Sequence, residues 1–200
     1  MRSLSPVFLF FSVLFACNSG IKNNSNPTVN SHSKLNDSLA AVLKIVLEQD
    51  QMYRSDTSHE HLLLQMDYDR ENLNKVIRIL NKYGWPGPEI VGENGNIALF
   101  LVIQHADIRT QRKYLPVVRK AVINHKLDGK SWILLEDRVS LADRGMQIYG
   151  SQVVSHQYGI WDVEPIMDEK NVNKRRQKLG LEKLEDYLKT FGIAYKLPDN

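Results

Sequence analysis

The segment DYDRENLNKVIRILNKY, residues 67–83, decides the fold class. Its apolar residues recur at intervals of three and four, which places them on one face of a helix: Leu73, Val76, Ile77, Leu80 and Tyr83. Asp67 or Asp69 is the expected N-cap, because a short carboxylate can accept from the free N–H groups of the first turn. The segment Gly84-Trp85-Pro86-Gly87-Pro88 ends the helix, because proline cannot continue it. A helix with one apolar face must pack against other elements.

Working outward, the same periodicity predicts more helices and one hairpin. The run 97–103 is entirely apolar and fits a buried helix or a buried strand; its helical neighbours favour a helix. Pro116 is expected to bend its helix or to mark its start. After Met146, short β-branched and aromatic stretches predict a β-hairpin. The expected fold is a mainly α, single helical domain of about five to seven helices with one C-terminal hairpin, built from helices 35–54, 67–83, 97–103, 109–126, 130–144, 172–179 and 181–190 and from strands 147–154 and 158–163.

Composition excludes several classes of protein. With 42% hydrophobic and 24% charged residues, the 200-residue chain is neither fibrous nor wholly disordered. A net charge of +3 is too small to indicate nucleic acid as a partner. The chain has a single cysteine, so an internal disulfide and a cysteine-based zinc site are excluded. Phosphate-binding glycine loops and calcium loops are absent from the sequence, and His59-Glu60-His61 lacks further clustered ligands, so we expect no cofactor and no metal.

The N-terminus is typical of an export signal. Arg2 precedes an apolar run from Val7 to Ala16, which is shorter than the ~20 residues needed to span a membrane. The run ends in Leu14-Phe15-Ala16-Cys17, which resembles a bacterial lipobox, although Phe15 is bulky for it. We therefore expect a signal peptide over 1–16 and lipid attachment at Cys17. The alternative is an ordinary secretory signal with an incidental cysteine.

Residues 17–34 are predicted to be a flexible tether, because residues 18–33 are rich in Asn and Ser and contain few apolar side chains. The folded domain is then expected over 35–200. Acyl chains on Cys17 would hold this domain at a bacterial membrane in the cell envelope. Lipoproteins that reach the cell surface typically carry an acidic export tag after the lipidated cysteine. No acidic cluster follows Cys17, so by this resemblance a position facing the periplasm is expected.

Several polar side chains fall inside the apolar stripes of the predicted helices. Asp50 lies on the apolar side of the first helix and Asn72 on that of the second. Gln104 ends the apolar run 97–103, and Arg138 points along an apolar face with Asp137 at its edge. Burying such groups without partners costs about 1–3 kcal/mol each or more. They indicate either a structural hydrogen-bond network or a pocket for a ligand or a reaction.

The residue types would suit general acid–base chemistry. His105 is the candidate acid or base, because its pKa lies near neutrality, and Asp107 or Asp137 is its candidate carboxylate partner. On a helix His105 and Asp107 point in opposite directions, so a direct pair requires a strand or a helix that ends at Gln104. Arg138 is the candidate clamp for a carboxylate or phosphate. Tyr149 and Gln152 are candidate positioning donors.

The segment Gln147-Ile148-Tyr149-Gly150-Ser151-Gln152 contributes these donors from the predicted hairpin. As a strand it would place Tyr149 on the face of Gln147 and Ser151, and Gln152 on the other. Gly150 in this position suggests that another segment packs close to the backbone. A bulge or a tight twist is the alternative explanation.

Taken together, several blocks resemble a bacterial family known as a domain of unknown function. They are Asp50-Gln51 with Arg54, Asp69 with Asn72, Tyr83-Gly84-Trp85-Pro86, Gln104-His105-Ala106-Asp107, Glu136-Asp137-Arg138 and the 147–152 segment, in which Ser151 stands where Thr is commoner. The resemblance covers about residues 35–187. It implies a mainly helical domain, often exported or lipid-anchored, and supplies no catalytic assignment.

Two functional hypotheses follow from the residues. One is a membrane-anchored enzyme of hydrolase or transferase type, with His105, Asp107, Asp137 and Arg138 as catalytic residues. The other is a non-catalytic binding module or structural envelope protein, in which the same groups hold a small polar or anionic ligand or knit the core. In both, Gln104, Tyr149, Gln152, Asn72 and Asp50 are the candidate ligand-binding residues, the membrane is reached through the N-terminal lipid, and nucleic acid is not a partner.

Overall fold

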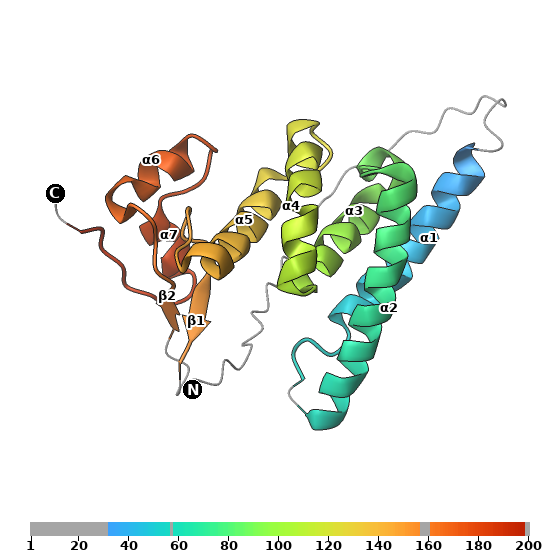
Figure 1. The fold of residues 1–200 in the computed structure, drawn as a ribbon, viewed down its shortest axis with the longest axis horizontal. Coiled ribbons are helices and arrows are strands. Elements are labelled where there is room, and N and C mark those ends of the chain that lie inside the picture. Colours follow the sequence, from blue (N-terminus) through green and yellow to red (C-terminus); the bar gives the residue numbers. More distant parts are fainter. Residues whose placement is uncertain (1–31, 57, 157–160, 199–200) are drawn as a thin grey trace. The chain divides into compact units, whose positions relative to one another are not determined.

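The computed structural model describes residues 32–56, 58–156 and 161–198. In these residues the protein is mainly helical with one small antiparallel hairpin, as predicted (Figure 1). The predicted signal peptide, Cys17 and all of the predicted tether before residue 32 lie outside the described residues. The chain divides into two compact units, one up to Val102 and the other from Ile103.

The first unit is built from α1 (His32–Gln51), α2 (His59–Tyr83) and most of α3 (Pro88–His105). Helices α1 and α2 pack against each other, and Leu43, Val46 and Val76 are completely buried. Gly84 ends α2 as expected, donating its N–H to Leu80 O. The prediction for the α2 N-terminus was wrong, because the helix starts eight residues before Asp67. Ser58 is the N-cap, and three exposed leucines after it hide the amphipathic pattern in the sequence.

The prediction of a helix over 97–103 is confirmed, and α3 is longer than its apolar run. Gly92 interrupts it with a φ of 70°, a backbone conformation that glycine adopts readily. Trp85, just before α3, donates its indole N–H to Asn96 Oδ1 at 2.7 Å. This contact attaches the Gly-Trp-Pro turn to α3.

The second unit contains α4 (Ile108–Ile123) and α5 (Gly129–Arg144), which pack against each other. Pro116 lies inside α4 and does not mark its start, because Asp107 caps the helix. Gly145 ends α5 in the left-handed conformation. The antiparallel hairpin pairs β1 (Val153–Ser155) with β2 (Trp161–Val163). A 3-10 turn and two short helices complete the described unit: η2 (Glu169–Asn171), α6 (Val172–Gln177) and α7 (Leu184–Lys189).

The predicted first strand is too long. Residues 147–152 form a loop, and only Gln147 makes an isolated parallel bridge, to Ile166. The expected alternation of Tyr149 and Gln152 across two faces therefore does not apply. Gly150 has a φ of 76°, and a Cβ on it would lie 2.6 Å from Leu184 Cδ1. The prediction that another segment packs close to Gly150 is confirmed, and that segment is α7.

Candidate functional site

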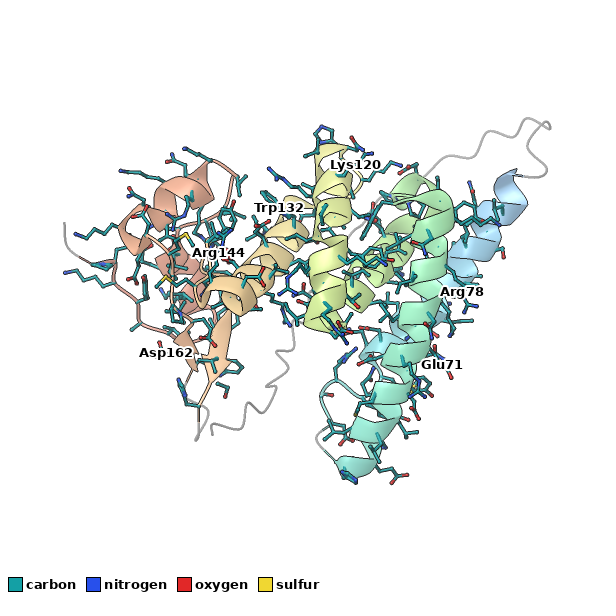
Figure 2. The ribbon with its side chains drawn as sticks, viewed as in Figure 1. Glu71, Arg78, Lys120, Trp132, Arg144 and Asp162 are labelled. Atoms are coloured by element: carbon teal, nitrogen blue, oxygen red, sulfur yellow. The ribbon has the colours of Figure 1, made fainter. Side chains whose placement is uncertain are left out.

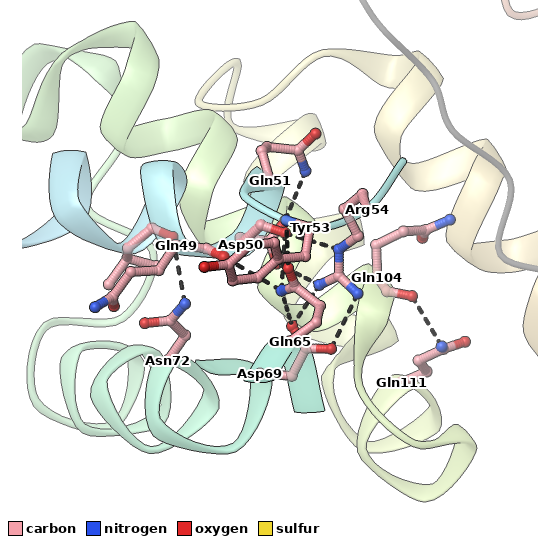
Figure 3. Close-up of polar contacts among 11 residues, drawn as sticks. Gln49, Asp50, Gln51, Tyr53, Arg54, Gln65, Asp69, Asn72, Gln104 and Gln111 are labelled. Atoms are coloured by element: carbon pink, nitrogen blue, oxygen red, sulfur yellow. Dashed lines mark hydrogen bonds and ion pairs between the residues drawn. The ribbon is translucent and has the colours of Figure 1, made fainter. Parts of the chain in front are cut away.

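In the first unit, a buried arginine joins α1 to α2. Arg54, just after α1, donates to Asp50 Oδ1 at 3.0 Å and to Asp69 Oδ2 at 2.9 Å (Figure 3). The Arg54 and Asp50 side chains are 7% and 1% exposed. We call this contact between the end of α1 and α2 the α1–α2 corner. Gln65 belongs to it, accepting from Tyr53 N at 3.0 Å and donating to Asp69 Oδ1 at 2.9 Å. These groups bind each other, so their arrangement connects two helices.

Asn72 has a similar role farther along the same pair of helices. It is fully buried and donates to Val46 O at 3.3 Å, which adds a polar contact inside the apolar seam of α1 and α2. The sequence predicted that Asp50 and Asn72 point inward, and both are buried. It did not single out Gln65, whose place in the corner depends on the earlier start of α2.

At the junction of α3 and α4, the predicted pair His105 and Asp107 does not act together. His105 is the last residue of α3 and is half-buried. Asp107 is exposed and caps α4, accepting from Thr110 N at 2.9 Å. This backbone hydrogen bond lowers the pKa of Asp107. The carboxylate proposed as a partner for His105 is therefore engaged in capping a helix.

Two buried polar residues in α4 were not among the sequence candidates. Gln111 is 6% exposed and donates to Gln104 O at 3.0 Å and Ala106 O at 2.8 Å (Figure 3). Because its amide nitrogen is used in this way, Gln111 Oε1 points elsewhere, and it has no partner in the described residues. Tyr114, one turn farther, is 4% exposed and its hydroxyl also lacks a partner there. Gln104 Oε1 is the third unpartnered oxygen.

Asp137 is fully buried and holds the loop after α5. One oxygen accepts from Ile148 N at 2.7 Å and Tyr149 N at 2.9 Å, and the other accepts from Ser151 N at 2.9 Å. Burial raises the pKa of Asp137, and the three N–H donors oppose that rise by stabilising the ionised form. Both oxygens are therefore engaged by backbone groups.

The same loop is held from its other side. Gln147 is fully buried, and its side chain accepts from Gln152 N at 2.7 Å and donates to Gln152 O at 2.9 Å. Arg175 and Arg176 on α6 donate to Ile148 O and Tyr149 O at 2.9 and 2.8 Å. Burial raises the pKa of Tyr149, whose ring makes an edge contact with Trp132. The Gln152 amide donates to Leu134 O at 3.2 Å, so it also serves the loop.

Arg138 differs from these engaged groups. Its Nε is buried and unpartnered, and no ion pair joins its guanidinium to a carboxylate in the described residues. Burial lowers the pKa of Arg138, because desolvation disfavours the charged form. Asp137 is its neighbour in sequence, but it points to the loop. The structure therefore leaves a half-buried arginine, with a buried and unpartnered Nε, without a counter-charge in the part of the chain that it describes.

The pairing of α4 with α5 shows which part of α4 lies level with Arg138. Arg112 Nε donates to Asp143 Oδ1 at 3.1 Å, and the Arg119 guanidinium lies 5.4 Å from the ring centre of Trp132, which is labelled on α5 in Figure 2. The two pairs show that α4 and α5 run antiparallel. Arg138 is five residues before Asp143, which places it level with residue 117, and six residues after Trp132, which places it level with residue 113. Tyr114 lies within this range. Tyr114 and Arg138, each of which has an unpartnered buried side-chain atom, therefore lie at a similar level along the helix pair.

Two shallow hollows do not include the predicted residues. One, of about 320 Å³, is lined by Ala40, Lys44 and residues 91–95; the other, of about 300 Å³, is lined by Glu185, Lys189 and residues 192–195. Among the described residues, no group of three or more His, Cys, Asp or Glu side chains is placed to hold a metal ion. None of the described helices combines the length and apolarity needed to cross a membrane.

The structure defines a mainly helical protein with one short hairpin. Within each unit, buried polar contacts connect neighbouring elements. The chain belongs to the Family of unknown function (DUF6624), whose model matches residues 40–199. The sequence-based resemblance to a family of unknown function is confirmed at this level; export and lipid anchoring stay predictions. Neither the curated proteins nor the solved structures contain a significant match.

Proposed function

We propose that the protein is a lipid-anchored binding module of the bacterial cell envelope that holds a small anionic ligand at Arg138. The observation that carries this proposal is the half-buried Arg138, whose buried Nε has no partner and whose guanidinium has no carboxylate partner in the described residues. An unpaired buried charge is costly, and it is normally paired or neutralised. A ligand carboxylate or phosphate would supply the missing charge, and the planar guanidinium can bind either with two hydrogen bonds.

Three other unpartnered buried atoms of the second unit are consistent with a polar ligand. Tyr114 can donate its hydroxyl proton to an anion bound by Arg138, with which it is level. Gln111 Oε1 and Gln104 Oε1 are acceptors, so they suit N–H or O–H groups elsewhere on the ligand. Each such atom costs about 1–3 kcal/mol when it is buried without a partner. A ligand that satisfied them would recover part of that free energy.

Binding is better supported than acid–base catalysis. The two carboxylates predicted to assist His105 are both engaged: Asp107 caps α4, and Asp137 accepts three backbone N–H groups. Either would have to give up these contacts to orient an imidazole. Arg138 and Tyr114 have no such prior engagement in the described residues.

The anchor is the second part of the proposal. The apolar run ending at Ala16 and the Leu-Phe-Ala-Cys sequence support cleavage before Cys17 and lipidation there. The variant Cys17→Ala should leave the membrane pellet and appear in the soluble fraction. A variant that still sediments with membranes would show that something else anchors the protein.

The ligand site is tested with inorganic phosphate and with acetate as probes at low ionic strength. A probe at 100 times its Kd stabilises the folded state by about 2.7 kcal/mol, which raises Tm by roughly 5–10 °C for a chain of this size. We expect at least one probe to stabilise the wild type and Arg144→Gln, an exposed control on the same helix, but not Arg138→Gln. The response to each probe separately distinguishes phosphate from carboxylate recognition.

The contrary results are equally clear. If neither probe stabilises the wild type, or if Arg138→Gln responds as the wild type does, Arg138 is not the anion site. A large loss of stability in Arg138→Gln without any probe response in the wild type would assign the arginine to architecture.

A further inference from the structure

Helix α1 carries a second apolar face that the described residues leave exposed. Leu35, Val42, Ile45 and Met52, the last just after α1, are 41%, 39%, 52% and 49% exposed. They are distinct from the buried stripe that contacts α2, which includes Leu43 and Val46 at 0% exposure. A surface helix normally has a single apolar face. The second face indicates a partner.

The spacing of the exposed residues is that of a coiled coil. Leu35 and Val42 are seven residues apart, as are Ile45 and the position of Met52, and the two rows are offset by three. Seven-residue repeats offset in this way form the seam through which two helices pack as knobs into holes. Ser38 and Gln49 occupy the two remaining positions of the repeat, and Gln49 Oε1 accepts from Lys75 Nζ of α2 at 3.3 Å, so Gln49 lies at the edge of the seam.

We propose that this seam, defined as Leu35, Val42, Ile45 and Met52, binds α1 of a second copy of the chain in parallel orientation. A seam of this kind is self-complementary when identical rows meet in register. The orientation rests on the anchor of the proposed function. Fourteen residues separate Cys17 from His32, so the start of α1 lies at most ~50 Å from the anchoring lipid. Two copies anchored in one membrane therefore present their α1 helices from the same end.

The start of α2 also carries exposed apolar side chains. Leu62, Leu63 and Met66 are 45%, 51% and 65% exposed there. This part of α2 lies beside the end of α1, because Gln65 Nε2 donates to Gln49 O at 3.2 Å. These side chains enlarge the apolar area available at the C-terminal end of the seam.

We expect the dimer to be weak in free solution. Four half-exposed side chains and a small extension provide less than the ~800 Å² per partner of a standard interface. Anchoring both copies in one membrane raises their effective concentration without adding contacts. The dimer is therefore a property of the anchored protein.

Cysteine cross-linking in membranes tests the seam directly. The single natural cysteine is Cys17, whose thiol is consumed if it is lipidated. Oxidation of the wild type therefore measures the cross-linking that does not come from an introduced cysteine. Ile45→Cys places a thiol on the seam, and Lys44→Cys places one on an exposed position beside it. Oxidation should convert Ile45→Cys into a covalent dimer on non-reducing gels and leave Lys44→Cys monomeric, because a disulfide needs Cβ atoms about 4 Å apart.

The orientation and the anchor have separate readouts. A mixture of Val42→Cys and Ile45→Cys chains would cross-link preferentially with each other in an antiparallel pair, which would overturn the parallel arrangement. The membrane pellet is measured for each variant first, so failure of the anchor appears as loss of protein from the pellet. Absence of the Ile45→Cys dimer in anchored protein, or equal cross-linking of Lys44→Cys, would overturn the seam.

Discussion

Replacing Gly150 by alanine probes how the loop after α5 is held. Gly150 has a φ of 76°, and a Cβ there would lie 2.6 Å from Leu184 Cδ1 and 3.2 Å from Ile166 Cδ1. The shorter distance is well inside van der Waals contact, so the loop or the Leu184 side chain must move. The substitution therefore adds steric overlap to backbone strain.

The two contributions can be separated. A left-handed conformation costs alanine about 1–2 kcal/mol, and overpacking costs about 1–3 kcal/mol more, so Gly150→Ala should cost about 2–5 kcal/mol. For a chain of this size, that lowers Tm by roughly 5–15 °C. Gly145→Ala is the matched control, because Gly145 has a φ of 69° and nothing within 4 Å of its Cβ position. It should show the strain alone.

The assay is reversible unfolding of both variants in urea, followed by helical circular dichroism. The double variant Gly150→Ala with Leu184→Ala should lose less stability than the two single variants together, because the shortened side chain relieves the overlap. Equal melting of Gly150→Ala and Gly145→Ala would refute the packing of this loop against α7. Additive losses in the double variant would assign the extra cost to another contact.

Three further substitutions test the polar contacts. Asp137→Ala leaves three loop N–H groups without acceptors and should cost about 3 kcal/mol or more in urea unfolding, whereas the exposed Asp128→Ala should cost much less. Arg54→Met leaves two carboxylates at the α1–α2 corner and should cost about 3–5 kcal/mol, against little change for the exposed Arg70→Met. For Asp107, whose pKa is lowered by capping, the stabilising charge is present above the unfolded-state pKa and is lost as pH falls through the folded-state value. Unfolding free energies of wild type and Asp107→Asn should therefore differ at pH 7 and converge below about pH 4; a constant difference would contradict the capping charge.

Periodicity was sufficient to predict the helices, because α1, α4 and α5 each have a regular apolar stripe. It failed where the stripe is obscured. The first turns of α2 contain three consecutive exposed leucines, which give no amphipathic signal although leucine is a good helix former. Residues 147–152 have the composition of a strand, but Asp137 and Gln147 engage their backbone and hold them as a loop.

The inward polar residues were also predictable as a set, whereas their partners were not. Asp50, Asn72, Gln104 and Asp137 all lie in apolar stripes, and all are buried. Their hydrogen bonds reach backbone groups or side chains on other elements, and helical spacing carries no information about such partners. For Gln111 the available signal was its position on the same α4 face as Tyr114 and Val118, where an amide needs a partner.

Whether a buried polar group is architectural depends on whether its hydrogen-bonding capacity is used. Asp137 uses both oxygens on three N–H groups, so removing it can only loosen the loop. Arg138 follows it in the sequence and has the opposite character, because its buried Nε has no partner in the described residues. A core selected for stability alone gains nothing from a cation in that state, and an apolar side chain of similar volume would be less costly. Arg138 therefore has a hydrogen-bond donor available for a ligand, whereas neither acceptor oxygen of Asp137 is free. This is the physical reason for placing the ligand at Arg138 and assigning Asp137 to the scaffold.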